Sequence, residues 1–138
     1  METIDIVTIV AATLAALTKI IDNVTTIKKA KFFAKFTENG NVVYMEKNPI
    51  GRILFRKFGI AGGCWITFAL VVIICTVVAW EAIVDGNFAY KVASIVIFGL
   101  LTYGHISAGI HNTTGRQTLI VRVTLKCYGW IGRTFGKK

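Results

Sequence analysis

Hydrophobic residues in this chain form long uninterrupted stretches. Phe58 to Trp80 and Val92 to Gly115 contain no Asp, Glu, Lys or Arg. Because about 20 apolar residues in a helix cross the hydrocarbon core of a bilayer, each stretch is long enough to span it. The Leu, Ile, Phe and Val residues of Phe58–Trp80 favour insertion by roughly 3 to 7 kcal/mol in total. The alternative, two buried helices of a soluble protein, requires a larger domain to enclose them.

A third candidate lies near the N-terminus. Residues 6–18 are uncharged, and the segment extends further if it includes Lys19 and Asp22. These two side chains are three positions apart, so they can pair on one helix face, and Lys19 can also extend to the headgroups. A cleaved signal peptide begins with positive charge, whereas this segment begins with Glu2 and Asp5. We therefore expect a third span, with an interfacial helix as the alternative.

The pattern predicts an all-α integral membrane protein with three transmembrane helices. We treat residues 1–138 as one membrane domain. Its expected parts are spans at about 4–27, 58–83 and 88–111, a basic cytoplasmic loop at 28–57 and a basic amphipathic tail at 116–138.

Charge predicts the orientation. The chain carries 16 Lys and Arg against 7 Asp and Glu, a net charge of +9. Basic segments remain cytoplasmic, so the protein is expected in the plasma (inner) membrane with its N-terminus outside and its C-terminus inside. The rule supports the orientation of the last two spans more directly than that of the first. The cations expected at the membrane surface or at a partner are Lys28, Lys29, Lys31, Lys35, Arg52, Arg56, Lys57, Arg122, Lys126, Arg133 and Lys137.

The segments between the spans carry turn and cap signals. Asn39-Gly40 between strand-prone residues predicts a small hairpin or a tight turn. Asn48-Pro49 is typical of a helix start, with Asn as N-cap and Pro in the first turn. Ile50–Lys57 mixes cations with large apolar residues, so we expect it to lie at the interface and to continue into the second span at a glycine-rich junction.

Small residues recur at a spacing of four. Gly59 and Gly63 form a G-x-x-x-G motif, and Gly104 and Ala108 form a weaker version. Such motifs let helix backbones approach closely. They predict helix packing within this chain or, alternatively, a homo-oligomer.

The C-terminal tail predicts a surface helix. On a helical wheel Arg122, Lys126, Arg133 and Lys137 form one stripe opposite an apolar face. This arrangement is typical of a helix that lies on a membrane. The competing interpretation is a strand, because residues 119–127 also alternate imperfectly.

Few residues point to chemistry. Lys19, Asp22 and His105 are polar side chains expected within the membrane, where ionisable groups suggest function. His105 with Asp22 and Glu81 could form a proton or ion pathway, or His105 could simply bond between helices. No catalytic residue is singled out. Three scattered cysteines and two histidines suggest packing rather than a metal site, and no cofactor is expected.

The basic charge does not require nucleic acid as a partner. The cations lie beside the spans and among aromatic residues, and anionic lipid attracts each of them by about 1 kcal/mol. We therefore expect membrane lipid, particularly anionic lipid, as the main partner, together with a homo-oligomer or a larger membrane complex.

Short motifs resemble a family of small prokaryotic multi-pass membrane proteins of uncharacterised activity. That family has an Asp near the end of the first span and a Thr soon after, then Glu-x-Asn-Pro before the second span and a Tyr…Asn pair ending a later one. The corresponding residues here, within Thr3–Asn112, are Asp22, Thr25, Thr26, Glu46, Asn48, Pro49, Tyr103, His111 and Asn112. The resemblance implies the architecture and a cytoplasmic-membrane location, and it directs attention to Asp22, Glu46 and Asn48.

Three functions are compatible with these features. The leading hypothesis is a non-enzymatic accessory or scaffold subunit whose basic cytoplasmic face binds anionic lipid or an acidic partner. The first alternative is a small pore-forming protein, because size, span number and a charged tail also resemble phage holins. The second is a subunit that transports ions or protons.

Overall fold

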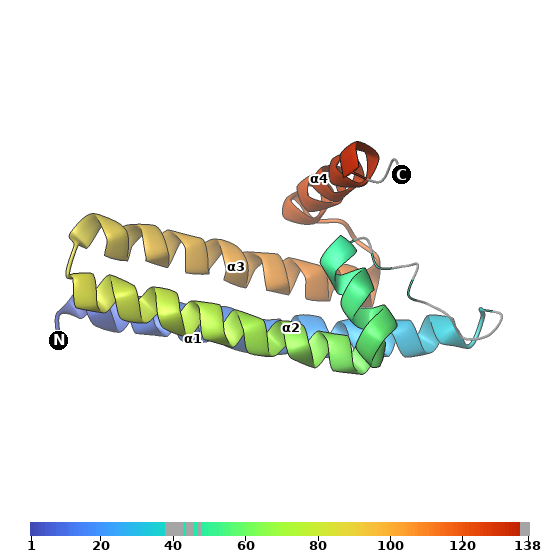
Figure 1. Ribbon diagram of the computed structural model, residues 1–138, viewed down its shortest axis with the longest axis horizontal. Coiled ribbons are helices and arrows are strands. Elements are labelled where there is room, and N and C mark those ends of the chain that lie inside the picture. The colour runs from blue at the N-terminus through green and yellow to red at the C-terminus, as the bar shows by residue number, and fades with distance from the viewer. Residues whose placement is uncertain (38–42, 44–45, 47, 136–138) are drawn as a thin grey trace.

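The computed structural model describes residues 1–37, 43, 46 and 48–135, with the side chains of those up to 130. Within this part the chain forms four helices and no strand: α1 (Thr3–Ala34), α2 (Pro49–Asp85), α3 (Phe88–Thr114) and α4 (Leu119–Phe135). Figure 1 shows α1, α2 and α3 side by side along their length, and α4 projecting from the end of α3. The tail is therefore helical, as predicted. The hairpin predicted at Asn39-Gly40 lies outside the described residues.

Local side-chain chemistry sets the helix ends. Asn48 caps α2, since its Oδ1 accepts a hydrogen bond from the backbone N–H of Ile50 at 3.0 Å, and Pro49 follows in the first turn. The predicted start of this helix is thus confirmed. Asn87 caps α3 in the same way through the N–H of Ala89 at 2.9 Å. Gly86, in the left-handed conformation with φ 68°, ends α2 immediately before this cap.

A glycine divides α2 into two parts. Gly59 has φ 71° and ψ 167°, a backbone region open almost exclusively to glycine. The first part, Pro49–Phe58, turns away from the second and crosses the end of the bundle (Figure 1). A Cβ atom at Gly63 would lie 2.5 Å from Cδ1 of Phe55, so glycine also permits the close approach after the turn. The junction predicted at these glycines, between the first segment of the helix and its long apolar part, is therefore confirmed.

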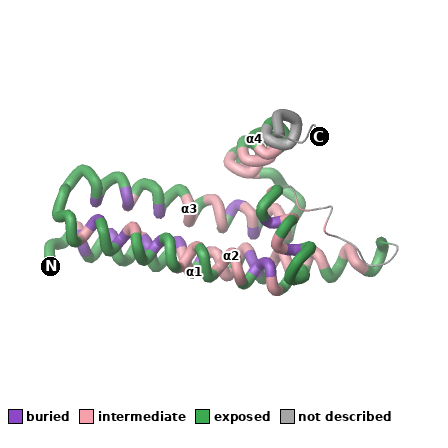
Figure 2. The backbone as a smooth tube through the Cα atoms, viewed as in Figure 1, coloured by how far each residue is buried: buried purple, intermediate pink, exposed green. Residues whose placement is uncertain are grey.

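Helix α1 lies between its neighbours and contacts both α2 and α3. The buried residues follow its inward face, as the purple stretches in Figure 2 show. Ala12 and Ala15 of α1 pack with Cys75 and Ala79 of α2 and with Phe98 of α3. Small side chains on α1 and α2 let the helices approach closely, and the Phe98 ring fills the remaining space.

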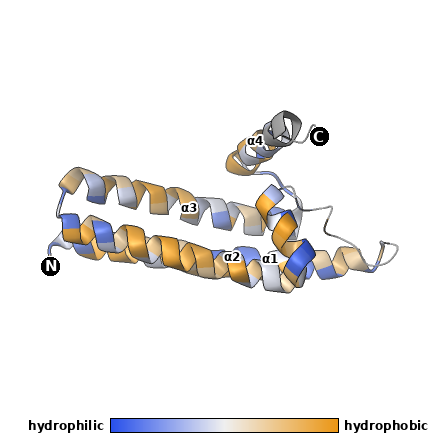
Figure 3. Cartoon of the chain, in the orientation of Figure 1, coloured by the Kyte–Doolittle hydropathy of each residue, from blue (hydrophilic) through white to orange (hydrophobic). Residues whose placement is uncertain are grey.

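The interior of the bundle contains polar as well as apolar side chains, whereas its outer surface is apolar. The fully buried polar side chains include Thr8 and Asn23 of α1 and Ser94 and Ser107 of α3. Large apolar side chains instead cover the outer surface, including Leu17, Ile21, Leu70, Ile73, Ile74, Val77, Val96, Ile97 and Leu100. Figure 3 shows this as a largely apolar middle section of α2. In the described chain α1, α2 and α3 are long and apolar enough to cross a membrane.

Candidate functional site

Charged side chains meet at one end of the bundle, which we call the Asp5 end. The Nζ atom of Lys91 on α3 lies 2.7 Å from Oδ1 of Asp5 on α1 and 3.3 Å from Oε2 of Glu2. Lys91 and Asp5 are both buried. This ion pair ties the start of α1 to the start of α3.

A cavity of about 560 Å³ lies at the opposite end, which we call the Asn23 end. All four helices and residue Glu46 line it. Its polar residues come mainly from α1 and α3, whereas Phe55, Ile60, Ile120 and Leu125 supply part of an apolar wall. A mixed lining of this kind is typical of a site for a small organic or amphiphilic molecule.

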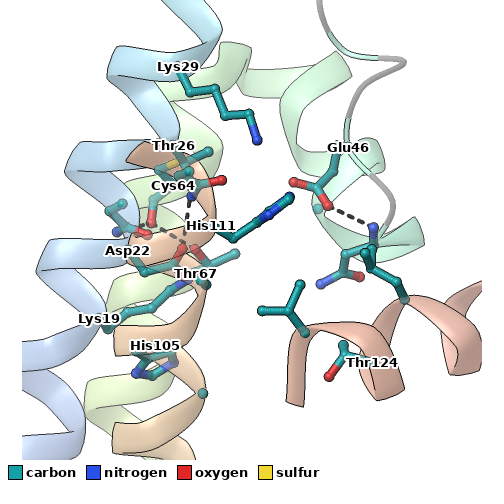
Figure 4. A pocket seen from close by; sticks show the side chains of 18 of the residues that line it. Lys19, Asp22, Thr26, Lys29, Glu46, Cys64, Thr67, His105, His111 and Thr124 are labelled. Atoms are coloured by element: carbon teal, nitrogen blue, oxygen red, sulfur yellow. Dashed lines mark hydrogen bonds and ion pairs between the residues drawn. The ribbon is translucent and has the colours of Figure 1, made fainter. Parts of the chain in front are cut away.

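A hydrogen-bonded network joins α1 to α3 at this cavity (Figure 4). Lys19 and Asp22 form the predicted ion pair, with 2.6 Å between Nζ and Oδ2. The hydroxyl of Thr26 donates to Oδ1 of Asp22 at 3.4 Å, and Nδ2 of Asn112 donates to the same hydroxyl oxygen at 2.8 Å. The Asp22 charge is therefore balanced by Lys19 within the network.

Two polar atoms at the cavity are buried without a hydrogen-bond partner among the described residues. Asn23 is fully buried, and its Nδ2 donates to the backbone carbonyl of Cys64 at 2.7 Å, which fixes α1 against α2. Its Oδ1 is one of the two atoms, and Nδ1 of His111 is the other. Because buried polar atoms are usually paired, a bound ligand or water at these atoms would satisfy an existing need.

Glu46 and Asn48, two described residues just before α2, border the cavity on another side. Oε1 of Glu46 accepts the backbone N–H of Asn48 at 2.7 Å, and Arg52 donates to the Glu46 carbonyl through Nε at 3.1 Å. In Figure 4 the side chains of Lys29, His111 and Glu46 point toward a common space from three different parts of the chain. The site thus brings a cation, an imidazole and a carboxylate around one volume.

His105 and Tyr128 complete the polar lining. Nδ1 of His105 lies 3.1 Å from the backbone carbonyl oxygen of Ala15, so this nitrogen carries the proton if the bond forms. Burial raises the pKa of the Tyr128 phenol on α4 above its ordinary value, and its hydroxyl can act as a hydrogen-bond donor at the cavity. His105 therefore bridges α1 and α3, which is the structural alternative that the sequence left open.

Six of the nine residues on which the expected family resemblance rests line this cavity, whereas Thr25, Pro49 and Tyr103 do not. Asp22, Thr26, Glu46, Asn48, His111 and Asn112 all line it, although they lie on separate elements. Tyr103, by contrast, is exposed on α3. Sequence reasoning missed Asn23, whose spacing of four from Lys19 and three from Thr26 was the available signal.

The cations predicted at a surface fall into three groups. Lys29 lines the cavity, and Arg52 is partly buried against Glu46. The side chain of Arg133 and the whole of Lys137 lie outside the part of the chain that the structure describes. The exposed group consists of Lys28, Lys31, Lys35, Arg56, Lys57, Arg122 and Lys126.

The predicted packing residues occupy different settings. Gly59 and Gly63 form the turn in α2, and Gly104 and Ala108 line the cavity. The close approach of α1 and α3 occurs at Gly109, where an added Cβ would lie 3.2 Å from Cγ2 of Ile21.

The described side chains contain no group of three or more His, Cys, Asp or Glu that could hold a metal ion. Cys64 and Cys75 are buried free thiols on α2, and Cys127 is an exposed free thiol on α4. No known family model, curated protein or solved structure matches this chain.

Proposed function

We propose that this protein is a non-enzymatic membrane scaffold or accessory subunit whose basic cytoplasmic face binds anionic lipid. The observation that carries the proposal is the placement of two surface helices. Pro49–Phe58 and α4 both leave the bundle at the Asn23 end and expose cations beside large apolar side chains (Figure 1). That combination suits the boundary between headgroups and acyl chains.

The outward face of α4 supports this placement. Leu119 and Trp130 are 74% and 61% exposed, and Val123, Arg122 and Lys126 are exposed with them. At 100° per residue these five positions fall within about 100° of the helix circumference, with the cations on one side and the apolar residues on the other. The residues turned toward the cavity are Ile120, Val121, Thr124, Leu125 and Tyr128. A helix seated on a membrane can insert its exposed apolar edge while its cations contact lipid phosphates.

The first part of α2 has the same character. Ile50 and Ile53 are both 64% exposed, and Arg56 and Lys57 are exposed nearby. The Lys57 ammonium lies 5.4 Å from the centre of the Phe58 ring. The turn at Gly59 directs this segment across the bundle end, where a membrane surface would lie.

The lengths of α1 and α3 support a position of the two surface helices at the inner boundary of the membrane. If Asp5 lies at the outer boundary, a hydrocarbon core of about 30 Å at about 1.5 Å per residue ends near Thr25 on α1. The same count from Lys91 ends near His111 on α3. Both positions adjoin the residues that line the cavity, so the two surface helices would begin at the inner boundary.

The packing favours a scaffold over a transport subunit. The apolar cluster of Ala12, Ala15, Cys75, Ala79 and Phe98 lies between the polar groups at the Asp5 end and those at the Asn23 end. A proton route through one bundle would have to cross this layer. A pore formed by several copies stays an alternative that leakage of a dye from induced cells would detect.

The test measures whether α4 of the full chain inserts its exposed apolar edge into a membrane surface. With Trp65→Phe and Trp80→Phe in place, Trp130 is the remaining tryptophan, and its emission reports burial at the headgroups. We expect a blue shift in vesicles containing phosphatidylglycerol relative to vesicles of phosphatidylcholine, and loss of the difference in Arg122→Glu/Lys126→Glu.

A charge-preserving control separates electrostatics from folding. Arg122→Lys/Lys126→Arg keeps both charges and should retain the blue shift. An emission maximum that is the same in both vesicle types, or that is insensitive to charge reversal, would overturn the proposal.

A further inference from the structure

We propose that the cavity at the Asn23 end holds the headgroup of one zwitterionic phospholipid with a primary ammonium, of the phosphatidylethanolamine class. In this arrangement the phosphate lies toward Lys29 and His111 and the ammonium lies toward Glu46 (Figure 4). The site differs from the proposed basic surface, which needs only net positive charge. This inference rests on the membrane orientation in the proposed function, but it does not depend on the binding of anionic lipid at the basic surface.

The depth of the cavity favours a lipid over a soluble molecule. Its polar lining begins near Lys19 and extends to Lys29 on α1, and it reaches Asn112 on α3. The count of about 20 residues from the Asp5 end places the inner edge of the hydrocarbon core within this range. A phospholipid has its phosphate and ammonium at that depth and its acyl chains immediately below.

The charges around the cavity balance. Asp22 is already paired with Lys19 at 2.6 Å. Two further charged side chains line the cavity, namely the Lys29 ammonium and the Glu46 carboxylate, which also accepts the backbone N–H of Asn48. One cation and one anion complement a headgroup that itself carries one of each, whereas an anionic headgroup leaves Glu46 facing like charge.

The hydrogen-bonding atoms match the same headgroup. Nδ1 of His111 is buried with no hydrogen-bond partner among the described residues, and in the tautomer protonated there it donates to a phosphate oxygen. Oδ1 of the fully buried Asn23 is likewise unpartnered in that part of the chain and can accept from a ligand N–H or a water. A primary ammonium donates to a carboxylate, and the trimethylated ammonium of phosphatidylcholine has no N–H to donate.

The remaining lining suits acyl chains. Phe55 and Ile60 of α2, Leu101 of α3, and Ile120 and Leu125 of α4 border the polar groups. A volume of about 560 Å³ lies in the range of small-ligand sites, enough for a headgroup and the first carbons of its chains. The apolar side gives those carbons a contact surface that a free headgroup would leave unused.

The experiment is a lipid competition read by native mass spectrometry. The full chain in mild detergent receives equal amounts of dioleoyl phosphatidylethanolamine, phosphatidylglycerol and phosphatidylcholine, and singly lipidated protein is counted. We expect phosphatidylethanolamine adducts to exceed each of the others by about tenfold, the ratio given by one charge-assisted bond of about 1.4 kcal/mol. Equal binding, or a preference for phosphatidylglycerol, would overturn the inference even if no variant were made.

Variants assign the preference to the cavity. Glu46→Gln should reduce phosphatidylethanolamine to the level of phosphatidylcholine, while Glu81→Gln, an exposed carboxylate at the other end of α2, should change nothing. Lys29→Met should weaken the binding of all three lipids to a similar extent, because each of them has a phosphate. An unchanged preference in folded Glu46→Gln protein contradicts the inference.

A surface variant separates this site from the proposed function. Arg122→Glu/Lys126→Glu removes exposed cations and should leave the single-lipid preference intact. If that variant alone abolishes the preference, the lipid is bound at the basic surface and the cavity assignment is wrong. If the variant loses the blue shift in phosphatidylglycerol vesicles but keeps the preference for phosphatidylethanolamine, both proposals stand.

Discussion

The Nζ atom of Lys91 lies 2.7 Å from Oδ1 of Asp5, and the two side chains are only 4% and 8% exposed. Lys91 is the sole Lys or Arg between Phe58 and Gly115. The other carboxylate oxygen of Asp5 accepts the backbone N–H of Glu2 at 2.7 Å, so one side chain both caps α1 and neutralises Lys91. The pair explains how a lone cation is accommodated at the end of the bundle that we assign to the outside.

Breaking this pair on one side should destabilise the bundle more than removing both partners. Lys91→Met leaves the Asp5 carboxylate buried without its cation, so we expect a lower thermal unfolding midpoint in detergent. Asp5→Asn combined with Lys91→Met should recover part of the loss. Asp85→Asn, at an exposed position of the same end, serves as the control and should leave the midpoint unchanged. Equal midpoints for the single and the double variant would contradict the pairing.

The three free cysteines provide a test of orientation. Cys64 and Cys75 are each 3% exposed, whereas Cys127 on α4 is exposed. A membrane-impermeant maleimide should therefore leave intact bacteria unlabelled and should label Cys127 in inside-out vesicles. Cys127→Ser should abolish that labelling. When the Cys127→Ser protein is denatured in detergent, the maleimide should label Cys64 and Cys75, the two thiols that are buried in the folded chain. Labelling of intact cells would place the C-terminal helix outside.

The turn in α2 depends on glycine at position 59. With φ at 71° and ψ at 167°, an added side chain costs about 1 to 3 kcal/mol or forces the helix to straighten. Gly59→Ala should therefore lower the free energy of unfolding by that amount. Gly99→Ala, at a helical position with no heavy atom within 4 Å of a built Cβ, should be neutral or slightly stabilising. Denaturant titration in detergent measures both, and equal stabilities would show that the turn is not constrained by this residue.

The contact between α1 and α3 depends on Gly109. A Cβ atom there would lie 3.2 Å from Cγ2 of Ile21, so Gly109→Ile should separate the helices and cost about 1 to 3 kcal/mol through overpacking. Gly99→Ile adds the same side chain to the same helix in open space. We expect unfolding in detergent to show the loss only for Gly109→Ile. A comparable loss of stability in Gly99→Ile would indicate an effect of isoleucine on the helix itself rather than on the contact between α1 and α3.

Local rules explain what the sequence predicted well. The long apolar parts of α2 and α3 follow from runs without charge, because a helix that crosses a bilayer requires about 20 apolar residues in a row. The Lys19–Asp22 pair follows from a spacing of three on one helix, and the start of α2 follows from the cap chemistry of Asn48. Each of these features depends on residues a few positions apart, so no neighbouring helix is needed to define it.

The cavity could not be predicted in the same way. Lys29 belongs to a run of surface-type lysines, and only the packing of α1 against the rest of the described chain turns it toward Glu46 and His111. Asn23 is one polar residue in a long helix until its Nδ2 meets the Cys64 carbonyl on α2. Periodicity defines a face of each helix but not which neighbour that face meets.

The sequence by itself determined the two charge-free apolar helices, the Asn48 cap and the glycine-rich junction before the second of the three predicted spans, and it favoured a third apolar helix near the N-terminus. These follow from hydrophobicity and backbone chemistry, which act over a few residues. Only the tertiary structure decided that Lys91 pairs with Asp5 and that Lys29, Glu46 and His111 surround one space. Both arrangements join residues far apart in the chain, so they depend on how the helices rotate and pack against one another. Interior packing sets that rotation, because small residues such as Ala15 and Gly109 allow close contact only in certain orientations.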